Sequence, residues 1–405
     1  MKILALTSVY PQPDDGKEIV TPTVKYFCDK WVEMGHDVIV IHNNTSFPRL
    51  FYCIPDCLRS KLSSILGHNF PTLSSKNTLC RIENGVSIYR LPLQKIIPHG
   101  NFNNKVIALQ IEKIKEILKK EQFVPDVIIS HWANPQVEML IPLKNEYASK
   151  VSLVFHGDCS DRNIERFNIK EKVKHIDAIG CRNKMYALEV QKKLGLKKEP
   201  FICYSGIPDK LAEKRSYDLK KDINFIDNRE FIYVGRLVKY KNVDTIIKAL
   251  EKTFPAKDFV FHIVGEGAEE KNLANLSREF GLAKNIVFHG QLPRDEVFEL
   301  MEKCLCFCMV SDNETFGMVY IEAMLAGCVT IASKDGGVDG VIVDGKNGFL
   351  ARQGNVDDLA LKIKEVFNLS AMERESLRRR AVETAVEFSD SNVAYRYLND
   401  VNHRE

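Results

Sequence analysis

The feature that most constrains the fold is a repeated alternation of short β-branched runs and amphipathic helical segments. Each run is followed by a polar or glycine-containing turn and then by a helix-forming segment. Parallel strands need a crossover segment between them, so this alternation predicts parallel sheets flanked by helices. In the first half we expect strands at 2–7, 36–41, 126–130, 151–155, 177–181 and 201–204 and helices at 21–34, 103–120, 135–147 and 182–194.

A second unit of the same kind follows a charged segment, 209–229, that lacks periodicity. Its expected strands lie at 230–234, 259–264, 285–289, 304–310 and 329–333, with helices beginning at Val243, Ala268, Asp295 and Thr315. A chain of 405 residues exceeds what one hydrophobic core usually supports. We therefore predict two α/β domains, 1–205 and 206–388, and a last helix at 389–405 that Ser389 and Asp390 could cap. Segment 43–79 fits poorly and is interpreted as an insertion.

Composition excludes several classes of protein. With 45% hydrophobic and 27% charged residues and only strand-sized apolar runs, the chain is not expected to span a membrane. The start of the chain reads as a first strand rather than a secretory signal, which favours the cytoplasm. The 11 scattered cysteines favour reduced thiols. A net charge of +3 argues against broad nucleic-acid binding.

Polar clusters follow several expected strands, at the edge where ligands bind in open parallel sheets. After 230–234 comes GRLVKYKN, in which Gly235 permits close backbone approach while Arg236 and Lys241 add two cations. These residue types suit a diphosphate. A solvated turn with incidental basic residues is the alternative.

A second cluster follows the apolar strand 304–310. Glu314 precedes an expected helix whose first-turn N–H groups, from Thr315 to Met318, could hold an anion. Glu322 lies eight residues later, and carboxylates accept hydrogen bonds from sugar or ribose hydroxyls. The alternative assigns Glu314 to the helix dipole and Glu322 to the surface.

Two further clusters are less specific. His156 ends strand 151–155 beside Gly157, where it could reach a cleft or serve as a structural group. Gly265 and Gly267 form a strand-to-helix turn, but without a third glycine they do not make a dinucleotide fingerprint.

Five motifs occur in the order seen in retaining family 4 glycosyltransferases of the GT-B fold, which this chain resembles. They are GRLVKYKN, VGEGAEE, FHGQLP, ETFGMVYIEAMLAG and DGKNGFL, between residues 235 and 350. The resemblance implies two Rossmann-like domains with parallel sheets facing each other across a cleft and a final helix that returns to the first domain. The amino-terminal domain would lie on the acceptor side, with acceptor contacts expected from loops that include 14–22 and 43–79, and the carboxyl-terminal domain would bind the nucleotide sugar.

The resemblance also implies a role for each site residue. Arg236 and Lys241 would neutralise the donor diphosphate, Glu314 would contact the donor sugar and Glu322 the ribose. His156 would lie beside the transferred sugar, and together with Glu314, Arg236 and Lys241 it forms the expected catalytic set. The remaining expected donor contacts are Gly16, Gly235, Gly265, Gly267, Thr315, Phe316, Gly317 and Met318.

The chain departs from the family pattern at three places. The first loop has only Gly16 where two adjacent glycines are common, Ser205-Gly206 stands where Asn-Gly is usual, and Gly340 replaces a frequent glutamate. The donor base and sugar, the acceptor, the linkage and the oligomeric state therefore stay open.

We expect no cofactor and no metal, because two cations and a helix end can stabilise a departing diphosphate. The expected partners are a nucleotide-sugar donor and a saccharide or lipid-linked acceptor, with membrane contact through the aromatic and basic segment 47–70 and no nucleic acid. Cys304, Cys306 and Cys308 are expected in the core, and zinc at Cys53, Cys57, His68 and Cys80 is disfavoured by their spacing. An epimerase, a phosphorylase and a catalytically silent nucleotide-sugar-binding or scaffolding subunit remain alternatives.

Overall fold

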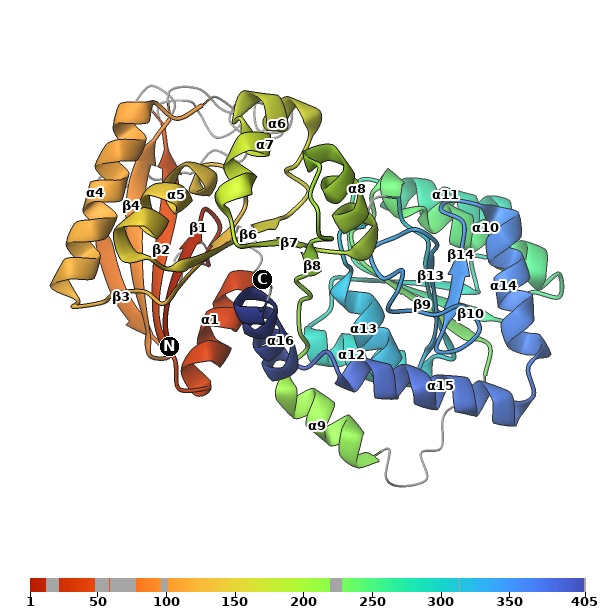
Figure 1. The fold of residues 1–405 in the computed structure, drawn as a ribbon. Coiled ribbons are helices and arrows are strands. Elements are labelled where there is room, and N and C mark those ends of the chain that lie inside the picture. Colours follow the sequence, from red (N-terminus) through yellow and green to blue (C-terminus); the bar gives the residue numbers. More distant parts are fainter. Residues whose placement is uncertain are drawn as a thin grey trace. The chain divides into compact units, whose positions relative to one another are not determined.

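The computed structural model describes residues 1–11, 22–47, 58, 78–95, 101–218, 228–312 and 314–403. The chain divides into two compact units (Figure 1). Unit 1 comprises residues 1–181, 186–203 and 394–405, and unit 2 comprises 182–185 and 204–393. Predicted Gly16 and most of segments 43–79 and 47–70 lie outside the described residues.

Unit 1 is built on a sheet with the strand order β3-β4-β2-β1-β5-β6-β7-β8. Among the strand pairs in the described residues of this unit, β3–β4 alone is antiparallel. The strands are β1 (Lys2–Thr7), β2 (Asp37–Ser46), β3 (Leu79–Glu83), β4 (Val86–Gln94), β5 (Val127–His131), β6 (Lys150–Phe155), β7 (Ala178–Cys181) and β8 (Phe201–Ile202). The helices are α1 (Thr23–Glu33), α4 (Asn104–Lys120), α5 (Gln136–Tyr147), α6 (Asp161–Arg166), α7 (Ile169–Lys172), η1 (Val173–His175) and α8 (Lys184–Leu194).

Helices cover both faces of this sheet. Leu4 and Leu6 pack in one core cluster with Ile111 and Ile114 of α4 and with α5. Successive side chains of a strand point to opposite faces of the sheet. The alternating residues of β1, such as Ile3, are just as buried but do not belong to this cluster, because they lie on the other face. Figure 1 shows α1 beside the last helix, α16 (Asp390–His403).

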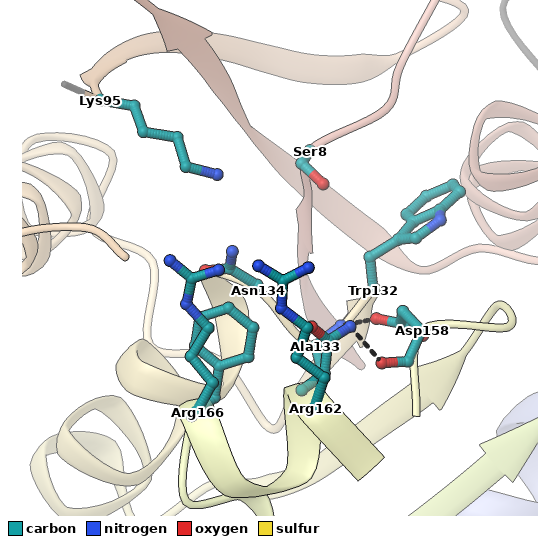
Figure 2. Close-up of a pocket in the computed structure, with 10 residues that line it drawn as sticks. Ser8, Lys95, Trp132, Ala133, Asn134, Asp158, Arg162 and Arg166 are labelled. Atoms are coloured by element: carbon teal, nitrogen blue, oxygen red, sulfur yellow. Dashed lines mark hydrogen bonds between the residues drawn. The ribbon is translucent and has the colours of Figure 1, made fainter. Parts of the chain in front are cut away.

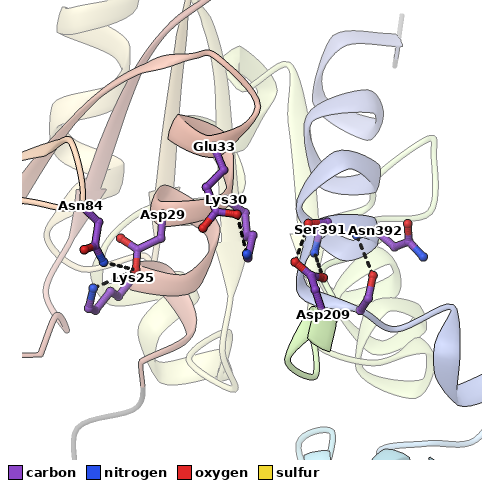
Figure 3. Close-up of polar contacts among 9 residues, drawn as sticks. Lys25, Asp29, Lys30, Glu33, Asn84, Asp209, Ser391 and Asn392 are labelled. Atoms are coloured by element: carbon purple, nitrogen blue, oxygen red, sulfur yellow. Dashed lines mark hydrogen bonds and ion pairs between the residues drawn. The ribbon is translucent and has the colours of Figure 1, made fainter. Parts of the chain in front are cut away.

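Aromatic side chains hold the end of α16 within unit 1. Tyr397 meets Phe27 and Trp31 edge to face, with ring centroids 5.2 and 5.6 Å apart, and Trp31 Nε1 donates a hydrogen bond to the Ala394 carbonyl at 3.1 Å. Figure 3 shows the polar contacts on α1, among them Lys25 with Asp29.

Polar contacts also define where α16 begins. Ser389 Oγ accepts from the Asn392 N–H at 3.2 Å, as expected for a capping residue. The Asp209 carboxylate accepts from both the N–H and the hydroxyl of Ser391, as Figure 3 also shows.

Unit 2 is a parallel sheet with the order β11-β10-β9-β12-β13-β14. Its strands are β9 (Glu230–Val234), β10 (Val260–Val264), β11 (Ile286–Gly290), β12 (Cys306–Met309), β13 (Val329–Ser333) and β14 (Phe349–Ala351). Its helices are α9 (Asp209–Asp218), η2 (Lys239–Lys241), α10 (Val243–Thr253), α11 (Glu270–Glu279), α12 (Arg294–Lys303), α13 (Met318–Ala326), α14 (Val356–Asn368) and α15 (Ala371–Val386).

Two expectations about elements were wrong, and one hairpin was not predicted. The insertion does not begin at residue 43, because β2 continues to Ser46 and pairs with β4 as far as Gln94. An antiparallel hairpin, β3–β4, turns at Asn84-Gly85, where both residues have positive φ, of 50° and 80°. Segment 209–229 is also not wholly irregular, since α9 occupies its first part.

The helix expected from Thr315 begins instead at Met318. Phe316 is buried between Tyr204 and Phe388, with ring centroids 5.3 and 6.1 Å away, which keeps this part of the chain in a loop. Gly317 then has φ 77°, a conformation that is easy for glycine. Glu314 and Glu322 therefore do not share one helix.

Candidate functional site

The strand order of unit 2 reverses between β9 and β12. From β9 the chain runs outward through β10 and β11, and from β12 it runs outward the other way through β13 and β14. Such a switch point leaves a crevice beyond the carboxyl ends of the two central strands. Arg236 and Lys241 follow β9 and Glu314 follows β12, so both clusters predicted from the sequence lie at this point.

The two clusters are in direct contact. Lys241 Nζ forms an ion pair with a carboxylate oxygen of Glu314, and the two side chains are 13% and 16% exposed. The Asp312 N–H donates to the Tyr240 carbonyl at 2.8 Å, and the Asn242 amide donates to the Val310 carbonyl at 3.0 Å. These bonds tie the turn after β9 to the loop after β12.

Arg236 belongs to the same turn and is exposed. Its guanidinium donates to the Tyr240 hydroxyl at 3.2 Å, and its carbonyl accepts from the Tyr233 hydroxyl at 3.0 Å. Burial, and then the charge of Glu314, raise the pKa of Tyr233, so this phenol stays protonated and can donate to the carbonyl. The turn therefore presents one exposed guanidinium beside a half-enclosed ion pair.

Glycines join a third strand end to the site. A Cβ on Gly265 would lie 2.0 Å from the Gly235 carbonyl oxygen, and one on Gly267 would lie 2.2 Å from the Leu237 carbonyl oxygen. The turns after β9 and β10 thus touch backbone to backbone, which requires glycine at both positions. Gly235 itself has φ 157°, in nearly extended backbone.

The loop from Glu314 to Met318 is held by residues that sequence reasoning missed. The Asn183 amide donates to the Thr315 carbonyl at 2.6 Å, and a Cβ on Gly337 would lie 2.8 Å from the Glu314 and Phe316 backbone. The adjacent glycines of the KDGG segment were the available signal for the second contact. No local signal marks Asn183, which lies more than a hundred residues away in the chain.

Glu322 is not joined to Glu314. It lies inside α13, 17% exposed, where its carboxylate accepts from Arg294 Nε at 2.9 Å and Nη2 at 2.5 Å. Both residues line a 480 Å³ cavity bordered by α9 and α12. Arg294 is therefore a further candidate contact for a ligand of Glu322.

His156 lies in unit 1, where the sheet has its own reversal between β1 and β5. Its ring stacks on Trp132 with centroids 4.0 Å apart, and its Nε2 lies 2.9 Å from His131 Nδ1. His131 Nε2 lies 3.3 Å from the Tyr397 hydroxyl. A chain of polar groups thus runs from His156 to the buried face of α16.

A group of residues that could hold a metal ion lies at the opposite edge of the unit 2 sheet from this site. It consists of Glu230, His262 and Cys304, whose candidate ligand atoms all lie within 4.8 Å of one another. Burial raises the pKa of the Cys304 thiol, which disfavours the thiolate that a metal needs. Cys304, Cys306 and Cys308 are fully buried, as predicted. The nine cysteines in the described residues have free thiols.

Comparison with known proteins identifies the family. Residues 217–386 match the model for glycosyl transferases group 1, a range that includes the candidate site after β9, β10 and β12. An uncharacterized glycosyltransferase of Methanocaldococcus jannaschii is 31% identical over 301 residues, which cover 72% of this chain and 78% of that protein. The chain belongs to the group 1 glycosyltransferases.

Other relatives of this glycosyltransferase extend the comparison. N-acetyl-alpha-D-glucosaminyl L-malate synthase of Bacillus anthracis is 24% identical over 71% of this chain and 78% of its own length. Sucrose-phosphate synthase of Thermosynechococcus elongatus has a TM-score of 0.66 at 17% identity, covering 98% of both chains. HepE of Anabaena, solved with UDP, has a TM-score of 0.67 at 17% identity, covering 98% of this chain and 99% of that one. The predicted GT-B class with two Rossmann-like domains is confirmed.

No helix in the described part of the glycosyltransferase is both long and apolar enough to cross a bilayer.

Proposed function

We propose that this glycosyltransferase moves a sugar, with retention at the anomeric carbon, from a nucleoside diphosphate sugar to an acceptor hydroxyl. The observation that carries the proposal is the Lys241–Glu314 ion pair at the switch point of unit 2, beside the exposed guanidinium of Arg236. Lys241 and Arg236 would bind the diphosphate, and Glu314 would accept hydrogen bonds from sugar hydroxyls.

The site suits a step in which charge develops on the leaving group. The bond between the anomeric carbon and the diphosphate oxygen breaks, and a bond from the acceptor oxygen to that carbon forms on the same face. The acceptor proton passes to the leaving phosphate, so we assign no protein base. Arg236 and Lys241 stabilise the departing charge without a divalent ion. No metal or organic cofactor forms part of the proposal.

We take UDP as the first donor nucleotide to test, because HepE was solved with UDP and with UDP-glucose. A role in cell-surface polysaccharide or glycolipid synthesis at the inner membrane face is the proposed context. It is supported by the fold shared with the lipopolysaccharide outer core galactosyltransferase WaaB, which has a TM-score of 0.66 at 16% identity.

Nucleotide binding by charge variants tests the proposal. UDP, GDP, ADP and the nucleoside uridine are titrated into the wild type and into Arg236→Met and Lys241→Met. Each variant should weaken UDP binding about tenfold or more and leave uridine binding nearly unchanged, because only UDP carries the diphosphate. Lys239→Met removes an exposed cation from the same turn and should change neither.

A double variant, Lys241→Met with Glu314→Gln, removes both charges and controls for the unpaired carboxylate that Lys241→Met alone leaves. Equal losses for UDP and uridine in the single variants, or no binding of any nucleoside diphosphate by the wild type, would contradict the proposal.

A further inference from the structure

Unit 1 contains a 370 Å³ cavity that no part of the proposed donor site uses. Its lining comes from the carboxyl ends of strands around the reversal between β1 and β5: Ser8 follows β1, Trp132 follows β5, Asp158 follows β6 and Lys95 follows β4. The rule that places ligands at such reversals in open sheets therefore applies to unit 1 as well. Figure 2 shows these residues around the cavity.

Three cations border the cavity. Arg162 and Arg166 extend from α6 toward the space that Lys95 and Ser8 also border (Figure 2). Arg162 is exposed, and within the described residues none of the three cations pairs with a carboxylate. Arg166 donates to the Asn101 side-chain oxygen, and Lys95 lies 4.9 Å from the centre of the Phe102 ring. The groups that contact Arg166 and Lys95 in these interactions are therefore neutral and do not offset their positive charges.

Lys95 distinguishes the cavity from an ordinary basic surface. A lysine on a solvated face keeps its ammonium in water, whereas Lys95 is only 7% exposed. Burial, and then the positive charge of Arg166, lower the pKa of Lys95 to about 8. Holding the charged Lys95 near the Arg166 guanidinium is unfavourable until an anion enters.

The one carboxylate among the described lining residues, that of Asp158, already accepts hydrogen bonds from the backbone. Asp158 accepts from the Ala133 N–H at 2.5 Å and from the His156 N–H at 2.9 Å, so its charge is directed into the backbone after β5 and β6. The same contacts fix the position of Trp132, which lines the cavity and stacks on His156. The cavity is therefore next to the histidine predicted to act in catalysis.

We propose that this cavity binds an anionic group, a phosphate or a carboxylate, on the acceptor, with Lys95, Arg162 and Arg166 as its contacts. This inference rests on the proposed function, because it assigns the anion to the acceptor of that reaction. Guanidinium groups form bidentate hydrogen bonds with both phosphates and carboxylates. Ser8 and Asn134, which also line the cavity, can hydrogen-bond to hydroxyls of the same ligand. A neutral sugar alone would leave the three cations without a counter-charge.

The test titrates inorganic phosphate and succinate into the full chain in the presence of saturating UDP, which fills the proposed donor phosphate site. Binding is followed by calorimetry and by tryptophan fluorescence, to which Trp132 in the cavity lining contributes together with Trp31. Arg162→Gln, which removes an exposed side chain, and Lys95→Met should each weaken anion binding about tenfold or more. Lys170→Gln, an exposed cation on α7 outside the cavity, should change nothing.

Liposomes distinguish a lipid headgroup from a small soluble acceptor. If the protein co-sediments with phosphatidylglycerol liposomes but not with phosphatidylcholine liposomes, and Arg162→Gln abolishes this binding, the anion belongs to a lipid. Binding of the soluble anions alone assigns it to a small molecule.

Failure of this inference is separable from failure of the proposed function. UDP binding without any anion binding, or anion binding that Arg162→Gln and Lys95→Met leave unchanged, overturns the inference and leaves the function intact. Anion binding in a chain that binds no nucleoside diphosphate overturns both.

Discussion

Lys241 Nζ contacts the carboxylate of Glu314, joining the turn after β9 to the loop after β12 across the switch point of unit 2. Family resemblance assigns the two residues to different parts of one donor, yet in the structure their opposite charges are paired with each other. Under the proposed function, a diphosphate entering the site would compete with Glu314 for the ammonium, and the ion pair would hold Lys241 in place until then.

Glu314→Gln should separate binding from chemistry. The neutral amide no longer competes for Lys241, so UDP affinity should stay the same or rise, while sugar transfer falls about 100-fold or more. Calorimetry with UDP and turnover with the UDP-sugar that the nucleotide screen selects provide the two readouts. A variant that loses UDP affinity and turnover together would show that Glu314 serves the fold of the loop.

Gly267→Ala should damage the site through steric contact alone. The new Cβ would lie 2.2 Å from the Leu237 carbonyl oxygen, so the turns after β9 and β10 must move apart. We expect a loss of about 2 kcal/mol or more in the free energy of unfolding, together with weaker UDP binding. Circular dichroism during urea unfolding measures the first quantity.

Gly345→Ala is the matched control for that substitution. Gly345 has φ 72° but nothing within 4 Å of a Cβ, so alanine there should cost about 1 kcal/mol of backbone strain. UDP affinity should be unchanged. Equal effects of the two alanines on UDP binding would argue against the close backbone contact.

Tyr397→Ala should destabilise unit 1. Tyr397 is 2% exposed and packs against Phe27 and Trp31, so its removal should cost about 3–5 kcal/mol. Both tryptophans of the chain, Trp31 and Trp132, belong to unit 1, so their fluorescence during urea unfolding reports on this unit. Tyr395→Ala, at a residue 64% exposed on the same helix, should stay within about 0.5 kcal/mol of the wild type.

Unit 1 should lose stability in mild acid through His42. Burial, and then Arg90, lower the pKa of His42 from 6.5 to about 3, and Arg90 Nη1 lies 2.6 Å from His42 Nδ1. Between pH 6.5 and about pH 3, His42 binds a proton in the unfolded chain but stays neutral in the folded chain. The free energy of unfolding therefore falls as the pH is lowered through this range. At pH 5 the His42 contribution lowers the free energy of unfolding by about 2 kcal/mol.

Tryptophan fluorescence during urea unfolding at pH 7.5 and pH 5 measures that loss. In His42→Gln the free energy of unfolding should fall by about 2 kcal/mol less between these two pH values than in the wild type, because glutamine does not titrate. The other titrating groups should contribute as before. An identical pH dependence in the variant and the wild type would rule His42 out.

Local patterns predicted most of the elements. The β-branched runs at β1, β9 and β13 have the expected bounds because buried parallel strands need continuous apolar stretches. The hairpin at Asn84-Gly85 carried a recognisable turn signal, but no strand was predicted on either side of it, just after the segment interpreted as an insertion. The start of α13 was misplaced because burial of Phe316 against two distant rings, which no local pattern shows, decides it.

The sequence by itself determined the parallel α/β architecture, the family and the residue types at the strand ends, because periodicity and short motifs are properties of neighbouring residues. Tertiary structure alone decided that Lys241 meets Glu314, that Glu322 pairs with Arg294 instead, and that Lys95, Arg162 and Arg166 surround one cavity. The physical reason is that strand order, which sets the neighbours at a sheet edge, depends on packing between segments far apart in the chain.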